Sequence, residues 1–312
     1  MPNCLFCKEK LSKYKEKIYD TRFGVEGSFD IYKCNACGLV QLWSYLMSID
    51  SKSLYETYYN FGGYKKGLYT ILRTTFFFNP LYRLWMFLDG DISFYAKRGR
   101  GRLIDVGCNE GRSLRIFKNS GFIVEGLDFN ERAGTEARKD GFIVYTEYLD
   151  DFQPKKLYDV VVLSNVLEHS NSPKEMLNNV NRILKPGGLV WISCPNVDSW
   201  QRLVFGRYWI NWHVPFHITF FSTMTLKSLL DYTGFEVTKI KCATPSLWIA
   251  QSIIATLFAK KGKKNHVQRS PILLGILMLF LRFTFFPLLW LGNLLGRGDC
   301  LTLEASKKLT IS

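Results

Sequence analysis

Acidic side chains are scarce in this sequence: 27 aspartates and glutamates stand against 41 lysines and arginines, a formal net charge of +14. Such a surplus favours anionic partners, namely nucleic acid, a membrane surface or phosphorylated substrates, although it also serves solubility. The basic and apolar segments of a signal peptide are lacking, so we expect the chain to begin in the cytosol, where cysteines stay reduced. An apolar content of 47% excludes a disordered chain, and 312 residues suffice for one sizeable core and further modules.

The eight cysteines fall into two groups. Four lie singly inside apolar strand patterns, which is typical of core positions: Cys108, Cys194, Cys242 and Cys300. The other four form two CxxC pairs separated by the 26 residues 8–33: Cys4 with Cys7, and Cys34 with Cys37. Two such pairs can close a tetrahedral thiolate site, whereas a reducing compartment argues against disulfides. We therefore expect structural zinc in a small N-terminal ribbon, closed to substrate, with free thiols as the alternative.

The run LIDVGCNEG, residues 103–111, combines a buried strand, an acid and a glycine turn. Gly107 and Gly111 permit backbone angles that other residues avoid, and they let a ligand approach the main chain. Asn109 stands where a further glycine is expected, and asparagine tolerates the left-handed region. The run indicates a nucleotide-type cofactor site, with an ordinary strand-to-helix turn as the alternative.

Strand and helix patterns alternate from Gly101 onward. Strands are expected at 123–128, 159–164 and 188–193, and helices at 131–139 and 173–184. The alternation predicts an α/β fold with a parallel sheet whose ligands bind beyond the carboxyl ends of the strands. Asp128 closes the second strand, where a carboxylate can take both ribose hydroxyls. This geometry serves nicotinamide dinucleotides as well as S-adenosylmethionine.

Two further motifs separate these cofactors: YDVVVLSNVLEH at 158–169 and LKPGG at 184–188. With LIDVGCNEG and Asp128, they resemble the class I S-adenosylmethionine-dependent methyltransferases over residues 101–196. The resemblance implies a Rossmann-like sheet of seven strands with an antiparallel last strand. It also implies that Asp128 holds the ribose and Phe129 flanks the adenine. The other implied cofactor contacts are Asp105, Gly107, Cys108, Asn109 and Gly111 along the methionine part, and Asn165, Leu167 and Glu168 facing the transferred methyl.

The segment 208–222, followed by Gly234-Phe235, resembles methyltransferases of bacterial polysaccharide and glycolipid gene clusters. There, a histidine precedes an aromatic-serine pair and a helix that ends in glycine-phenylalanine, and His217 matches it. Three histidines are candidates for the catalytic base, each with a structural role as the alternative: His169, His213 and His217. The last two lie among aromatic residues that could stack on a sugar.

No Pro-Pro-Tyr or Pro-Pro-Phe follows Asn165 in the sequence. Many enzymes that methylate exocyclic base nitrogens resemble one another in having such an element there, so its lack disfavours a nucleic-acid substrate. RNA methylation stays open because some ribosomal RNA methyltransferases join a cysteine zinc module to this fold, and because the chain is basic.

The segment 271–295 is nearly continuous apolar sequence. As a straight helix it would extend about 37 Å, more than the ~30 Å hydrocarbon layer. However, residues 234–240 and 299–307 look like the sixth and the antiparallel seventh strand of one sheet, so the chain between them must leave and return on the same side. We expect a re-entrant or interfacial helical hairpin, broken near Arg282 and Pro287, with a basic connector facing anionic lipid. A buried dimer interface is the alternative.

The expected organisation is a zinc ribbon (1–45), an aromatic helical connecting region (46–100), the methyltransferase core (101–243), a membrane-associating insertion (244–297) and the final strand with the tail (298–312). The expected function is S-adenosylmethionine-dependent methylation, on oxygen more than on carbon, of a sugar or lipid-linked glycan. We expect it at the inner face of the cytoplasmic membrane, as a peripheral or monotopic protein whose oligomeric state stays open. A nonenzymatic zinc-ribbon membrane adaptor that keeps the fold is a further alternative.

Overall fold

The structure, a computed structural model, describes residues 3–42, 54, 57–58 and 93–309. Most of the expected connecting region, 46–100, therefore lies outside the described residues. The expectation of an aromatic, helical segment there concerns mainly residues that the structure does not describe.

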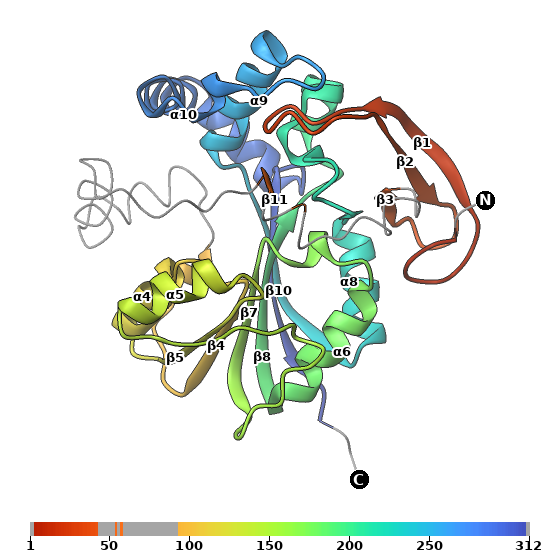
Figure 1. Ribbon diagram of the computed structural model, residues 1–312. Helices are drawn as coiled ribbons and strands as arrows, with labels where there is room; N and C mark the ends of the chain where they lie inside the picture. The colour runs from red at the N-terminus through yellow and green to blue at the C-terminus, as the bar shows by residue number, and fades with distance from the viewer. Residues whose placement is uncertain (1–2, 43–53, 55–56, 59–92, 310–312) are drawn as a thin grey trace.

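A sheet of seven strands lies at the centre of the larger part of the molecule, where Figure 1 shows it between two layers of helices. In sequence order its strands are β4 (Arg102–Val106), β5 (Ile123–Leu127), β6 (Ile143–Tyr145), β7 (Tyr158–Ser164), β8 (Leu184–Pro195), β10 (Phe235–Ala243) and β11 (Cys300–Lys307). Their spatial order is β10-β11-β8-β7-β4-β5-β6. β11 is antiparallel to both of its neighbours, and the pairs from β8 to β6 are parallel. The expected Rossmann-like sheet with its antiparallel last strand is confirmed.

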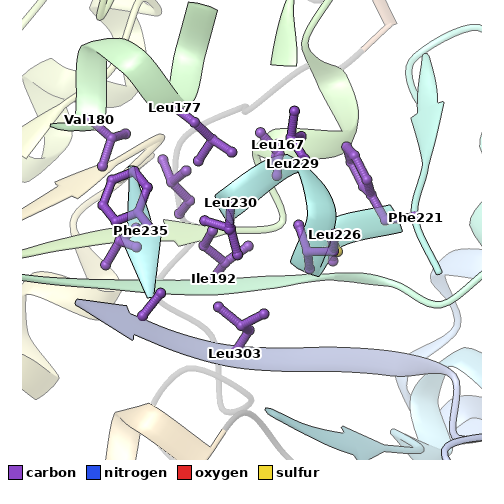
Figure 2. Packing of buried hydrophobic residues seen from close by; sticks show 14 of the residues in the cluster. Leu167, Leu177, Val180, Ile192, Phe221, Leu226, Leu229, Leu230, Phe235 and Leu303 are labelled. Carbon is purple, nitrogen blue, oxygen red and sulfur yellow. The ribbon is translucent and has the colours of Figure 1, made fainter. Parts of the chain in front are cut away.

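Helices cover both faces of this sheet. α4 (Arg112–Asn119) and α5 (Glu131–Lys139) lie on one face, and α6 (Pro173–Ile183) and α8 (Thr223–Tyr232) on the other (Figure 1). Figure 2 shows the second face, where Leu177 and Val180 of α6 and Leu226, Leu229 and Leu230 of α8 gather near Ile192 of β8 and Leu303 of β11. Each of these side chains is at most 1% exposed. Burial of each one stabilises the folded state by roughly 1.5–3 kcal/mol. Because both faces are covered, a ligand of this sheet is left with the carboxyl edge of the strands.

The N-terminal ribbon consists of β1 (Leu11–Ile18), β2 (Phe29–Cys34) and β3 (Val40–Leu42). A two-residue strand of the core, β9 (Thr219–Phe220), pairs with β3 and completes a four-stranded antiparallel sheet. The amide of Leu42 also donates to the carbonyl of Ile218 at 2.9 Å. The ribbon is thus joined to the core by backbone hydrogen bonds immediately before α8, which the sequence did not predict.

Two helices, α9 (Ser246–Phe258) and α10 (Pro271–Leu294), lie between β10 and β11 and pack against each other. The expected break near Arg282 and Pro287 is wrong, because α10 runs continuously through both residues. Pro287 removes one intrahelical donor without ending the helix. The Arg282 side chain is 2% exposed, and its Nη2 donates to the Thr244 carbonyl at 2.6 Å. This charged residue therefore ties α10 to the end of β10.

The remaining short elements are α7 (Trp200–Phe205) and the 3-10 helices η2 (Ser93–Ala96), η3 (Leu167–His169), η4 (Gly206–Tyr208), η5 (Ile210–Trp212) and η6 (His266–Arg269).

Most of the surface of α10 is exposed and apolar. Within the described residues, Ile272–Leu294 is the one helix whose length and composition suffice for a membrane crossing. Its large exposed apolar side chains are Ile272, Ile276, Leu279, Phe280, Phe283, Phe285, Leu288, Trp290, Leu291 and Leu294.

Both ends of α10 are held at the folded protein. The C-terminal end leads directly into β11, and the N-terminal end follows a connector whose Asn265 amide donates to the Arg22 carbonyl at 3.0 Å. Gln268 of the same connector donates to the Gln251 carbonyl of α9 at 2.7 Å. α9 has 13 residues, about 20 Å, and buries Ile249 against the protein. The two helices thus form a hairpin that leaves and returns on one side of the core.

Candidate functional site

The loop between β4 and α4 depends on two glycines. Gly107 has φ +73°, and a β-carbon there would lie 2.7 Å from Cγ2 of Val166. Gly111 has φ +72°, and its β-carbon would lie 2.7 Å from Cβ of Ala137. Asn109 adopts the left-handed conformation that the sequence predicts for it, with φ 48°. The loop therefore keeps its backbone accessible at the carboxyl end of β4, where a ligand can approach it closely.

Asp128 lies at the carboxyl end of the adjacent strand, β5, and is 5% exposed. Its Oδ2 accepts the amide of Asn109 at 2.8 Å, and its Oδ1 accepts the amide of Asn130 at 2.9 Å. Burial raises the pKa of this carboxyl, and the two amides act in the opposite direction. Each carboxylate oxygen keeps a second lone pair, so the pair can still accept the two hydroxyls of a ribose.

Asp105, at the end of β4, is 2% exposed and accepts a hydrogen bond from the hydroxyl of Ser113. Burial raises its pKa to about 7. The Cys108 side chain is 4% exposed and packs with Leu114 and Ala137, so only its backbone is placed to meet a ligand.

Phe129 follows Asp128 and stacks on Tyr148, with ring centroids 5.6 Å apart and planes 3° from parallel. Tyr148 is 48% exposed and was missed from the sequence. Its position three residues after β6, at the same edge of the sheet, is the signal that could have found it. The aromatic pair offers an apolar surface beside the carboxylate expected to hold the ribose.

The turn after β7 carries the third part of this edge. Asn165 has φ 54°, its amide donates to the Ser193 carbonyl at 2.9 Å, and its buried Oδ1 has no hydrogen-bond partner among the described residues. Leu167 is fully buried in the core (Figure 2), so its side chain serves packing and only its backbone could reach a cofactor. Glu168 is 1% exposed, and it lies among the histidines.

The three histidines expected to serve the acceptor come together in space. The ring of His217 lies 4.7 Å from that of His169 and 4.8 Å from that of His213, centroid to centroid. One ligand atom each of Glu168, His169 and His217 lies within 4.8 Å of the other two. Burial raises the pKa of Glu168 to about 8 and lowers that of His169 to about 4. Burial also lowers the pKa of His213 and His217 well below the usual value, so these rings are neutral at neutral pH.

The expected sugar-stacking surface around these histidines is not formed by the tryptophans. Trp209 and Trp212 are each 1% exposed, and Nε1 of Trp209 donates to Asp299 at 2.7 Å. They pack as core beneath the ribbon. The aromatic rings against the cluster include Phe216, which stacks on His213 at 4.9 Å, and Phe23 of the ribbon loop between β1 and β2, whose ring lies 5.7 Å from that of His213. The contact between Phe23 and His213 could not be predicted from local sequence, because it depends on the pairing of β3 with β9.

The four cysteines of the two CxxC pairs form a separate cluster in the ribbon. Sγ of Cys4 lies 3.5 Å from that of Cys37, and Sγ of Cys7 lies 3.4 Å from that of Cys34. All four sulfurs lie within 4.8 Å of one another. Tetrahedral zinc with Zn–S bonds of ~2.3 Å separates its sulfurs by about 3.8 Å. The donor set and its spacing fit that ion.

Parts of this chain are similar to known proteins. Residues 83–240 match the family described as a methyltransferase domain. The ubiquinone biosynthesis O-methyltransferase of Rickettsia felis is 27% identical over 212 residues, which are 63% of this chain and 84% of that protein. The protein of the same name from Pectobacterium carotovorum is 30% identical over 149 residues, 44% of this chain and 62% of its own length. A solved S-adenosylmethionine dependent methyltransferase from Mesorhizobium loti, 18% identical, covers 70% of this chain and 99% of its own with a TM-score of 0.45.

Proposed function

Because this chain belongs to the methyltransferase-domain family and is an S-adenosylmethionine-dependent methyltransferase, we propose that it methylates a hydroxyl of a sugar or lipid-linked glycan at the inner face of the cytoplasmic membrane. The observation that carries the proposal is the exposed apolar surface of α10, built into the sheet that bears the cofactor edge. Such a surface suits an enzyme that works on a lipid-linked acceptor, because an apolar helix face can bind at the membrane interface where that acceptor lies.

The residues of the cofactor edge divide the work. The bound S-adenosylmethionine supplies a methyl group that is already electrophilic. Asp128 is positioned to accept its ribose hydroxyls, and the loop at 107–111 offers backbone groups to its methionine part. Glu168 and the histidines line the side where the acceptor enters, and their burial keeps water from competing for the methyl.

The relatives support oxygen as the acceptor atom, because their names specify O-methylation. They also favour a second candidate acceptor, a hydroxyl of an intermediate of ubiquinone biosynthesis. The identity of the methylated product distinguishes the two candidates.

Two connected features support membrane attachment. Next to the exposed apolar face of α10, the connector carries four exposed lysines: Lys260, Lys261, Lys263 and Lys264. Lysines near an anionic lipid surface contribute about 1 kcal/mol each. Since the α9–α10 hairpin leaves and returns on one side of the core, the proposal is an interfacial anchor without a crossing.

We propose that the four cysteines of the ribbon hold structural zinc. With all four positions filled by protein, such a site has no place for substrate and acts by stabilising the fold.

The first test separates cofactor from acceptor. Titration with S-adenosylmethionine is expected to give a 1:1 complex, and methyl-labelled cofactor incubated with membrane extracts is expected to label a lipid-linked glycan. Label in an intermediate of ubiquinone biosynthesis would favour the second acceptor. A chain that binds no cofactor would instead fit an adaptor that keeps the fold, and label in RNA would contradict both acceptors.

Replacing His217 by alanine is expected to leave cofactor affinity within about threefold of the original while lowering transfer at least tenfold, since positioned acid–base groups contribute ~10²–10⁴. Cofactor titration and single-turnover transfer are the measurements. Turnover equal to that of the original chain would remove His217 from the mechanism.

Charging the apolar face of α10 is expected to release the protein from membranes. Ile276 and Phe283 are 61% and 69% exposed, so Ile276→Glu with Phe283→Glu should fold but lose roughly 1.5–3 kcal/mol of burial in lipid at each position. Flotation with vesicles containing anionic lipid is expected to fall more than tenfold. Met224→Glu on α8, 71% exposed in the original chain, is the matched control. An original chain that stays off vesicles as a soluble oligomer would contradict the anchor and favour a dimer interface.

A further inference from the structure

The carboxyl group of Glu168 is buried without a partner among the described residues. Its side chain is 1% exposed, and neither Oε1 nor Oε2 has a hydrogen-bond partner there. A buried carboxylate in this condition must be protonated or paired with a positive charge, because an isolated buried charge costs many kcal/mol. His169 and His217 each place one ligand atom within 4.8 Å of a carboxylate oxygen of Glu168.

The two histidines are oriented by the backbone. Nδ1 of His169 lies 2.8 Å from the Phe216 carbonyl, and Nδ1 of His217 lies 2.8 Å from the Asn211 carbonyl. A carbonyl oxygen only accepts, so each Nδ1 carries the proton and each Nε2 presents a lone pair. Histidines that bind metal ions are held in this manner, with the other ring nitrogen donating to a carbonyl or carboxylate.

The surrounding charges bear on whether a cation can stay there. Arg22, from the ribbon loop between β1 and β2, brings a positive charge within electrostatic range of all three histidines. The same guanidinium opposes a nearby cation, and the Glu168 carboxylate offsets that opposition. A negatively charged acceptor would add a further attraction for the cation.

We propose that Glu168, His169 and His217 bind one divalent transition-metal cation. Two imidazoles and one carboxylate, each with a ligand atom within 4.8 Å of the others, are a donor set that suits iron, cobalt, nickel and zinc. Three protein ligands leave coordination positions open, in contrast to the closed cysteine site. Resting on the proposed function, the open positions would take the acceptor oxygen and hold it at the end of β7, and His217 would then act on transfer as a metal ligand and not as the acid–base group.

The test uses cobalt(II) added to the full-length protein with one equivalent of zinc, which its thiolate ribbon retains because zinc binds more tightly than cobalt. We expect uptake of one further cobalt per chain, with visible bands of nitrogen and oxygen ligation and without thiolate charge-transfer absorption. Cobalt should also raise the midpoint of thermal unfolding, since a ligand of the folded state stabilises it.

Glu168→Gln and His217→Ala are expected to weaken cobalt binding at least tenfold, because even outer partners of metal ligands contribute ~10- to 100-fold. Glu175→Gln and His266→Ala, both at exposed positions, are the matched controls and should bind as the original chain does. Uptake that is equal in Glu168→Gln and the original, absent from the original, or accompanied by thiolate absorption would overturn the site.

Titration with S-adenosylmethionine, run on the same samples, keeps the two proposals apart. A chain that binds the cofactor but no cobalt loses the metal site alone. A chain that binds cobalt but no cofactor loses the proposed transfer and keeps the site.

Discussion

Replacing Asp128 by asparagine is expected to weaken binding of S-adenosylmethionine by about 10- to 150-fold, the equivalent of ~1.5–3 kcal/mol for hydrogen bonds to a charged group. In the original chain, the two carboxylate oxygens accept the backbone amides of Asn109 and Asn130 and are expected to accept the ribose hydroxyls as well. Asparagine keeps only one acceptor oxygen for these donors. Isothermal titration with the cofactor and with its demethylated product is the measurement.

The same substitution also tests the loop itself. The new amide nitrogen cannot accept the backbone amide opposite it, so one buried donor is orphaned and the free energy of unfolding should fall by ~1–3 kcal/mol. Asp151→Asn, at an exposed turn, is the control and should change neither quantity. Cofactor affinity that is unchanged in Asp128→Asn would place the ribose elsewhere.

The cofactor edge was largely predictable because its signals are local. Each signal can be recognised within a dozen residues: a glycine turn after a strand, an acid at the end of the next strand, and a polar turn after β7. The parallel order of the strands then brings these ends to one edge, a consequence of topology that does not depend on side-chain detail. The short edge strand β6 (Ile143–Tyr145) was implied only by the strand count, since three residues give little periodicity.

The acceptor side was harder to predict because long-range contacts decide it. The sequence indicated His169, His213 and His217 as candidates, and the fold brings them together. It gave no sign that Glu168 turns toward them and away from solvent, nor that the ribbon loop closes over the cluster through Phe23.

The helical insertion shows the same limit in another form. Arg282 and Pro287 indicated a break because each disfavours an apolar helix locally. The structure satisfies Arg282 through the distant carbonyl of Thr244, so the helix continues. Local propensity was overruled by a partner 38 residues away in sequence.

Substituting Cys34 by serine is expected to release the ribbon zinc and to unfold β1–β3 locally. Zinc binding supplies ~10–16 kcal/mol in small cysteine domains, and a hydroxyl is a poor substitute for a thiolate ligand. Hydrogen exchange should rise strongly in Leu11–Ile18 and Phe29–Cys34, whereas amides of Arg102–Val106 in the core sheet should stay protected. Metal analysis is expected to show one zinc fewer per chain than in Cys242→Ser, the control at a single cysteine outside the ribbon.

Loss of the zinc and unfolding of the ribbon should change the acceptor side of the site but leave the cofactor site intact. β3 shares backbone hydrogen bonds with β9, and the ribbon loop contacts the histidine cluster through Phe23, so Cys34→Ser should expose His213 and His217 to solvent. Their pKa values would then rise toward the usual one, because burial is the main cause of the depression. Asp128 and the loop at 107–111 have no ribbon residue among the partners of the hydrogen bonds given above, so cofactor affinity should change less than about threefold. A variant that keeps its zinc, or that loses cofactor and acceptor functions to the same extent, would contradict this division between ribbon and sheet.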